Sequence, residues 1–153
     1  MDIKNKITES VNPKSIDIDK RSVSQILDIF SHEDYKVVEA VNKSLNRVAS
    51  IIDIVISSLN NGGRLFYVGA GTSGRLGVLD AAECKPTFSV PDELVQGVIA
   101  GGNEAMFTSI ENAEDNIEDI SNIIQNRSVN CNDIIIGISC SGSAPFVLEF
   151  LKQ

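Results

Sequence analysis

Residues 64–74 read RLFYVGAGTSG, and this stretch decides the fold. Its first five residues are mostly the apolar and aromatic types that β-strands favour, and they lead directly into a glycine-rich turn. The hydroxyl-bearing Thr72 and Ser73 lie in that turn. A strand, a glycine turn and a helix in this order are typical of an open parallel α/β sheet.

The downstream sequence predicts that the same alternation continues. We expect a helix over residues 73–82 that stops before Pro86, a strand over 94–100, a helix from Asn103 to about residue 125, and a strand over 133–138. Strands that alternate with helices pair in parallel through right-handed crossovers. The fold class is therefore α/β, with a doubly wound parallel sheet.

The sequence before residue 60 has a helical period. Residues 1–20 are polar and read as an extended arm, and Ser22 with Gln25 forms a capping box for a helix to about residue 31. A longer helix is expected over 33–60. Its apolar residues recur in steps of three and four, at Val37, Val41, Leu45, Val48, Ile52, Val55 and Leu59. We therefore divide the chain into an arm with helices, 1–59, and a sheet domain, 60–153.

The sheet domain is expected to be incomplete. The sequence ends at Gln153, about two turns into the helix after the third strand. Three parallel strands leave a sheet edge and part of one face uncovered. The domain thus reads as truncated after its third strand.

Composition excludes several classes of function. The net charge is −8 and no Lys/Arg cluster occurs, which argues against binding to nucleic acid or to an anionic membrane. Three cysteines and the single His32 have no metal-ligand spacing, so we expect no metal and reduced thiols. Without a signal peptide or a long apolar run, the sequence predicts a cytoplasmic protein.

Two small-residue turns are the candidate binding loops. Gly69, Gly71 and Gly74 match the dinucleotide fingerprint, but the acidic residue expected after the second strand is missing, which disfavours a nicotinamide enzyme. The hydroxyls and Arg75 suit a phosphate or a sugar instead. Both turns could also be purely structural, as a glycine turn and a serine-rich helix cap. The expected substrate-binding residues are Gly71, Thr72, Ser73, Gly74, Arg75, Ser139, Ser141, Gly142 and Ser143.

Residues 62–84 resemble the signature of the N-acetylmuramic acid 6-phosphate etherases, members of the sugar isomerase (SIS) superfamily. Further blocks that look like this family lie at 86–88, 95–97, 100–102 and 111–115. The resemblance implies the N-terminal half of such an enzyme, with an SIS-type, flavodoxin-like three-layer sandwich. It also implies a homodimer and a phosphorylated amino sugar as substrate.

The resemblance assigns catalytic roles to two carboxylates, Glu83 as proton donor and Glu114 as the second catalytic group. Lactate leaves from C3 of the sugar and needs a general acid, while the C2 proton needs a general base. Water then adds at C3, so the reaction calls for no cofactor. Without the resemblance, Glu83 is a carboxylate at a helix end and Glu114 belongs to an acidic run typical of a solvated helix face, so neither position alone predicts catalysis.

One turn departs from the family pattern. Where the etherases usually read Ala-Ala-Ser-Gly-Arg-Thr-Pro, this chain has Ser143 and Ala144 in place of the Arg and Thr. If those groups hold the phosphate, a charge and a hydroxyl are missing. An etherase that acts in cell-wall amino sugar recycling is the leading hypothesis, and a non-catalytic phosphosugar sensor or an inactive fragment is the alternative.

Overall fold

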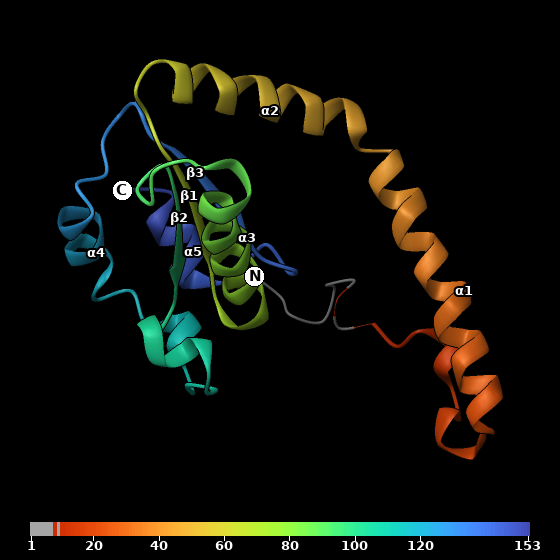
Figure 1. Ribbon diagram of the computed structural model, residues 1–153. Helices are drawn as coiled ribbons and strands as arrows, with labels where there is room; N and C mark the ends of the chain where they lie inside the picture. Colours follow the sequence, from red (N-terminus) through yellow and green to blue (C-terminus); the bar gives the residue numbers. More distant parts are fainter. Residues whose placement is uncertain (1–7, 9) are drawn as a thin grey trace. The chain divides into compact units, whose positions relative to one another are not determined.

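The computed structural model describes residue 8 and residues 10–153 (Figure 1). The chain forms two compact units, one that extends through Asp53 and one from Ile54 to Gln153. Their border falls inside a helix, a few residues before the predicted domain boundary at residue 60. Each unit is described by itself below.

A parallel three-stranded sheet organises the second unit. The strands stand in the order β2-β1-β3, so the first strand in the chain is the central one. This confirms the predicted parallel α/β sheet. The strands are β1 (Leu65–Gly69), β2 (Val95–Ile99) and β3 (Ile134–Ile138).

Helices cover the two faces of this sheet. Successive residues of β1 point to opposite faces. Tyr67 packs against Gly77 of α3 (Gly71–Phe88) on one face, while Phe66 and Val68 belong to a buried cluster on the other. That cluster includes Ile120 of α4 (Ile120–Asn126) and three residues of α5 (Pro145–Phe150). The sheet therefore lies between α3 on one side and α4 with α5 on the other.

Helix α3 is longer than the sequence predicts. Pro86 lies inside its last turn, where only one backbone hydrogen bond is lost, instead of stopping the helix. The helix ends at Phe88, and the cap residue Ser89 has a left-handed φ of 57° and donates its N–H to the Lys85 carbonyl.

The predicted helix over 103–125 is broken into three pieces. These are η5 (Gly102–Met106), η6 (Ala113–Asp115) and α4. Asn112 adopts a left-handed φ of 58°, and the Arg75 guanidinium takes the Met106 and Thr108 carbonyls as acceptors. A continuous helix would need these two carbonyls as acceptors for its own backbone N–H groups. Because Arg75 occupies them, the helix is interrupted here.

The helices before the sheet also break at a different place. The Ser22–Gln25 capping box is confirmed, and α1 runs from Val23 to Asn42 without interruption at His32. No Gly or Pro stands near His32 to stop it. The break falls at residues 43–44, before α2 (Leu45–Asn60). None of the helices in the described part of the chain has the length and hydropathy that crossing a membrane requires.

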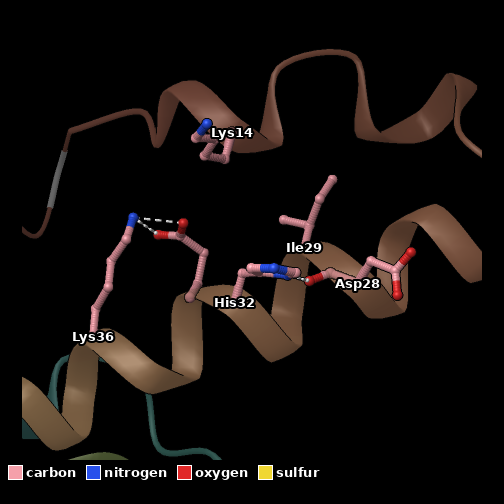
Figure 2. A pocket seen from close by; sticks show the side chains of 6 residues that line it. Lys14, Asp28, Ile29, His32 and Lys36 are labelled. Carbon is pink, nitrogen blue, oxygen red and sulfur yellow. Dashed lines mark hydrogen bonds and ion pairs between the residues drawn. The ribbon is translucent and has the colours of Figure 1, made fainter.

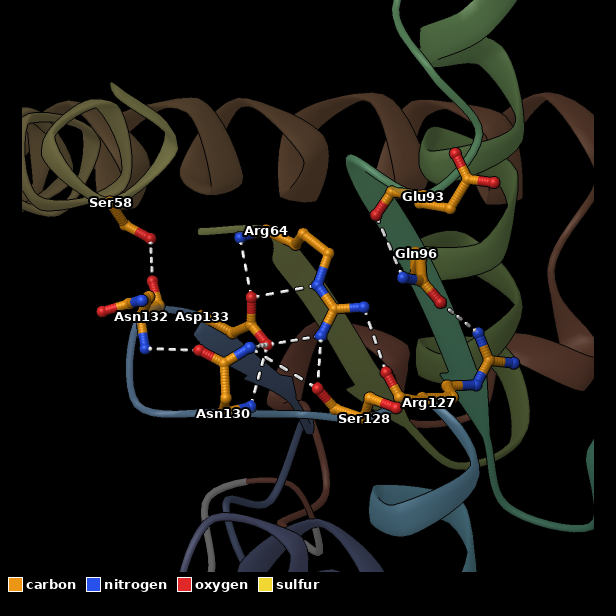
Figure 3. Close-up of polar contacts among 9 residues, drawn as sticks. All are labelled: Ser58, Arg64, Glu93, Gln96, Arg127, Ser128, Asn130, Asn132 and Asp133. Atoms are coloured by element: carbon orange, nitrogen blue, oxygen red, sulfur yellow. Dashed lines mark hydrogen bonds and ion pairs between the residues drawn. The ribbon is translucent and has the colours of Figure 1, made fainter. Parts of the chain in front are cut away.

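An ion pair ties the starting ends of β1 and β3 together (Figure 3). Arg64 donates to both carboxylate oxygens of Asp133, at 3.1 Å from Nε and 2.7 Å from Nη2. The same guanidinium donates to the carbonyls of Arg127 and Ser128, and it stacks 5.0 Å from the Phe66 ring centre. This network closes the edge of the sheet at which the strands begin.

The Asp133 carboxylate is almost completely buried, with 1% of its side chain exposed. Burial favours its neutral form, but hydrogen bonds from Arg64 and Asn130 outweigh that effect and hold its pKa below the usual value. A lowered carboxyl pKa stabilises the fold above the unfolded-state pKa of about 3.9. That contribution is lost as the pH falls through the lower folded-state pKa.

Replacing the arginine should therefore destabilise the fold in a pH-dependent way. At pH 7, Arg64→Ala should lower the free energy of unfolding by about 3 kcal/mol, because it leaves a buried carboxylate unpaired. The difference from the wild type should shrink as the pH falls through the lowered folded-state pKa of Asp133, because a protonated Asp133 leaves no buried charge unpaired when Arg64 is removed. Urea unfolding followed by circular dichroism across this pH range measures both effects.

The matched control is Lys85→Ala, which removes an exposed ion pair with Asp92. It should leave the unfolding free energy unchanged within error, since exposed pairs contribute little. Equal stability of the Arg64 and Lys85 variants would contradict the role given to the Arg64–Asp133 pair.

Candidate functional site

Three loops leave the sheet at one edge. Gly69 at the end of β1 is in register with Ile99 at the end of β2 and with Ile138 at the end of β3. Neighbouring strands lie about 4.8 Å apart, so the loops that follow begin side by side. The structure thus brings the two predicted binding turns, after β1 and after β3, to the same edge. In open parallel sheets this edge is where ligands bind.

The first turn leads into α3 with its backbone donors available. Ala70 is the N-cap residue and has no side-chain cap, and Gly71 has a left-handed φ of 54°. The N–H groups of an uncapped first turn lack intrahelical partners, and the helix dipole favours an anion there. Thr72 and Ser73 follow at once with their hydroxyls. This combination suits a phosphate group.

Gly74 allows the helix to begin this close to the strand. A Cβ atom at this position would lie 2.7 Å from the Gly69 carbonyl oxygen and 2.7 Å from a carbon of Ile99. Any larger residue would push α3 away from the strand ends. The glycine therefore fixes where the donors of the turn lie.

The second turn is held by its own serines. The Ser139 hydroxyl accepts from the Gly142 N–H at 3.1 Å, and the Ser141 and Ser143 hydroxyl oxygens are 2.8 Å apart. Gly142 supplies the left-handed φ of 64° at the bend. Ser139, Ser141, Gly142 and Ser143 thus form a pre-shaped polar loop next to the first turn. Ala144, however, is part of the buried cluster, so it contributes packing here.

Arg75, which the sequence predicts to bind substrate, makes structural hydrogen bonds in this fold. Its Nε donates to the Met106 carbonyl at 3.2 Å, and its Nη2 donates to the Thr108 carbonyl at 3.0 Å. A guanidinium carries five N–H donors, so others remain for a ligand. The positive charge therefore lies between the phosphate-type turn and the segment after β2. This bridge could not be predicted from residue types, because its acceptors are backbone carbonyls.

Glu114 lies on the segment that returns to the same edge. Its turn, η6, packs through Ala113 against Gly101, directly after β2. Glu114 itself is exposed. A cavity of about 390 Å³ opens beside Gly101 and Gly102. The polar side chains that line it are Asn116, Asp119, Asn122 and Asn126. They were not predicted from the sequence, although Asp119, Asn122 and Asn126 are spaced as residues on one face of a helix are.

Glu83 lies far from the turns within one chain. It is twelve residues after Gly71 on the same helix, and at 1.5 Å per residue the two are about 18 Å apart along the axis. Its side chain is exposed. The structure thus groups Glu114 with both turns at one edge and leaves Glu83 toward the other end of α3.

Tyr67 and Cys84, which both interact with Asp80 of α3, are poorly suited to acid–base or nucleophilic work at neutral pH. Burial and a hydrogen bond with Asp80 raise the pKa of Tyr67 to about 12, which keeps the phenol protonated. Burial, with a smaller effect of the Asp80 charge, also raises the pKa of the Cys84 thiol. The thiolate is the nucleophilic form of cysteine, so this residue is disfavoured as a nucleophile.

The first unit has a separate cavity between the arm and α1 (Figure 2). Lys36 donates to Glu33, which also accepts from the Asn12 amide at 2.8 Å. The His32 ring donates to the Asp28 carbonyl at 2.7 Å, and the residue is exposed as predicted. Of these contacts, the hydrogen bond from Asn12 to Glu33 joins the arm to the helix, and the other two lie within α1. In the described residues no three His, Cys, Asp or Glu side chains gather as a metal site would need.

Comparison with known proteins agrees with this geometry. Residues 47–153 match the sequence model of the glucokinase regulatory protein N-terminal SIS domain. The chain belongs to the SIS domain family. The match covers the whole sheet and both turns of the candidate site.

Curated relatives are named N-acetylmuramic acid 6-phosphate etherases. The protein from Clostridium acetobutylicum is 48% identical over 146 residues, which is 95% of this chain and 48% of the relative. The one from Picosynechococcus is 50% identical over 141 residues, 92% of this chain and 47% of the relative. The one from Vibrio vulnificus is 46% identical over 152 residues, 99% and 51%. This SIS chain spans about half the length of the curated relatives it matches.

The bridge from Arg75 to the segment after β2 gives a testable expectation. Arg75→Ala should raise amide hydrogen exchange over residues 102–116, because two of the hydrogen bonds that hold this segment are lost. Exchange in β1 should change little. Hydrogen–deuterium exchange with mass spectrometry reads both regions in one experiment.

Arg75→Lys is the matched control, since it keeps the charge but cannot reach two carbonyls with a planar fork. Exchange over 102–116 should be nearly as fast as in the alanine variant. Unchanged exchange in both variants would mean that the segment is held by other contacts.

Proposed function

We propose that this chain supplies the phosphosugar-binding part of an etherase that acts on N-acetylmuramic acid 6-phosphate. The reaction would cleave the D-lactyl ether and yield N-acetylglucosamine 6-phosphate and D-lactate, in cytoplasmic recycling of cell-wall amino sugars. The observation that carries the proposal is the meeting of the uncapped α3 turn and the serine turn at one sheet edge. The names of the relatives supply the substrate.

The phosphate would bind at the start of α3. Backbone N–H groups of Thr72 and Ser73, with their hydroxyls, would donate to its oxygens, and a free N–H of Arg75 would add a charge-assisted contact. The serines of the second turn would donate to the remaining phosphate or sugar oxygens. Such a site binds an anion although the chain has a net charge of −8.

Two proton transfers would accomplish the cleavage. In the open-chain aldehyde form of the sugar, a base removes the C2 proton, and the electron pair forms the C2–C3 double bond as the C3–O bond breaks. An acid donates a proton to the departing lactate oxygen. Water then adds at C3 and a proton returns to C2, so no net oxidation or reduction occurs. Glu83 and Glu114 are the proposed carboxylates for these transfers.

A phosphosugar sensor without catalysis is the second candidate. It is favoured by the match to a regulatory protein's SIS domain and by the distance of Glu83 from the turns within one chain. Ser143 and Ala144 stand where the etherases usually have Arg and Thr, which removes a charge from the second turn. Both candidates bind the same sugar phosphate, and they differ in lactate release.

Replacing either carboxyl group by an amide should abolish the reaction but leave sugar phosphate binding in place. Glu83→Gln and Glu114→Gln should each reduce lactate release by at least about 100-fold, the usual contribution of a general acid or base. Binding of the sugar phosphate should stay within about threefold, because neither side chain contacts the phosphate in this proposal. An enzymatic D-lactate assay and titration calorimetry measure the two quantities.

Glu118→Gln is the matched control, an exposed acid near Glu114, and it should behave as the wild type. Wild-type binding without lactate release would favour the sensor. Full lactate release by either the Glu83 or the Glu114 variant would contradict the assigned roles.

A further inference from the structure

The cavity beside Gly101 and Gly102 has a lining unlike that of the two binding turns. Its volume of about 390 Å³ is within the range of small-molecule sites in proteins. None of the described residues that line it belongs to either turn. Besides the two glycines, the lining consists of Asn116, Asp119, Asn122, Ile123, Asn126 and Phe146. We call this hollow the amide cavity.

One side of α4 supplies most of the polar lining. At 100° per residue, positions 119, 122 and 126 fall within about 60° of arc around the helix axis. Across from them, Gly102 leaves the rim of the cavity open, because a Cβ atom built on it would meet no atom within 4 Å. A ligand can therefore reach the polar side of α4.

The polar side chains of the amide cavity have hydrogen-bonding capacity to spare. With other described residues, the side chains of Asp119, Asn122 and Asn126 form no hydrogen bond or ion pair. The Asn116 side-chain oxygen accepts from the Glu118 N–H at 3.0 Å, which leaves its amide nitrogen as a donor. A carboxamide donates and accepts, whereas a carboxylate only accepts. The lining thus offers donors and acceptors together.

Charge disfavours a phosphate in the amide cavity. Among the described residues that line it there is no Lys or Arg, and Asp119 is an acid. The sequence from residue 111 to 119 contains five acidic residues and no basic one. An anion near these carboxylates would be repelled, and it would find no cation to pair with. The α3 turn differs, since it has uncapped N–H groups and Arg75 beside it.

An uncharged sugar ring matches this lining. Its hydroxyl groups donate and accept, as the carboxamides and the carboxylate require, and its C–H groups suit Ile123 and Phe146. Phe146 is 3% exposed and belongs to the buried cluster, so it provides an apolar floor. We propose that the amide cavity is a second binding site, which takes a neutral sugar. This site goes beyond the proposed function, because it needs neither phosphate binding nor lactate release.

The amide cavity adjoins the segment that carries Glu114. Asn116 lies two residues after Glu114. At the end of β2, a Cβ built on Gly101 would lie 3.3 Å from that of Ala113. A sugar held between Gly101, Asn116 and α4 would restrain this segment. Amide hydrogen exchange over residues 113–119 should therefore slow when the sugar is bound.

Titration of the ¹⁵N-labelled chain with N-acetylglucosamine tests the site directly. This neutral sugar should cause saturable NMR shifts at residues 101–102 and 116–126, including the side-chain amides of Asn122 and Asn126. The dissociation constant should be on the order of 1 mM, because a small ligand with a few hydrogen bonds binds weakly. Glucuronate, a sugar of similar size with a carboxylate, should bind at least about tenfold more weakly. Inorganic phosphate should leave residues 116–126 unshifted.

Asn122→Ala should weaken N-acetylglucosamine binding about fivefold, because the hydrogen bonds of one carboxamide are lost. Gln125→Ala is the matched control, an exposed carboxamide of the same helix that lies outside the cavity lining. It should bind the sugar as the wild type does.

Three results would overturn the proposed site. They are an equal loss of affinity in the two variants, sugar-induced shifts confined to residues 71–75 and 139–143, and no saturable shift at about ten times the expected dissociation constant. Inorganic phosphate is titrated into the same samples as a separate measurement. Sugar shifts at 116–126 without phosphate shifts at 71–75 would keep this site and reject the phosphate site of the proposed function.

Discussion

The backbones of Gly69 and Gly74 approach each other so closely that neither position could carry a side chain. A Cβ on Gly69 would lie 2.6 Å from the Gly74 nitrogen, and one on Gly74 would lie 2.7 Å from the Gly69 oxygen. This contact brings the first turn of α3 down onto the end of the central strand. The position of the uncapped N–H groups, the direction of α3 and the place of Glu83 all follow from it.

The edge at which the strands begin and the edge at which they end differ in how their polar groups are satisfied. At the starting edge, the Arg64–Asp133 pair and its backbone acceptors satisfy the polar groups with protein partners. At the carboxyl edge, the α3 turn has donors without a side-chain cap, and the serines form a loop around Gly142. The stabilising polar contacts thus lie at the edge where no ligand is expected. The hydrogen-bond donors that a ligand could use lie at the opposite edge. A phosphate is the ligand class that this division suits.

Local patterns predicted most of the sheet, because glycine turns, β-type runs and the Ser22–Gln25 capping box depend on neighbours in the sequence. The same reasoning failed over residues 102–119, where Arg75 removes backbone acceptors from a helix that local propensity favours. It also placed the break before α2 too early, since nothing near His32 stops a helix. The candidate turns could be read from their glycines and hydroxyls. The separation of Glu83 from the first turn also follows from the predicted helix between them, whereas the catalytic role of Glu83 comes from the family motif alone.

The central claim is that the two turns at the carboxyl edge bind a sugar phosphate. Amide NMR shifts during titration of the ¹⁵N-labelled chain with N-acetylmuramic acid 6-phosphate test this most directly. The claim predicts saturable shifts concentrated at residues 71–75 and 139–143, with little change around Arg64 and Asp133. Inorganic phosphate should move only the first of these sets strongly. Shifts confined to other parts of the chain, or no shifts at millimolar sugar phosphate, would contradict the account.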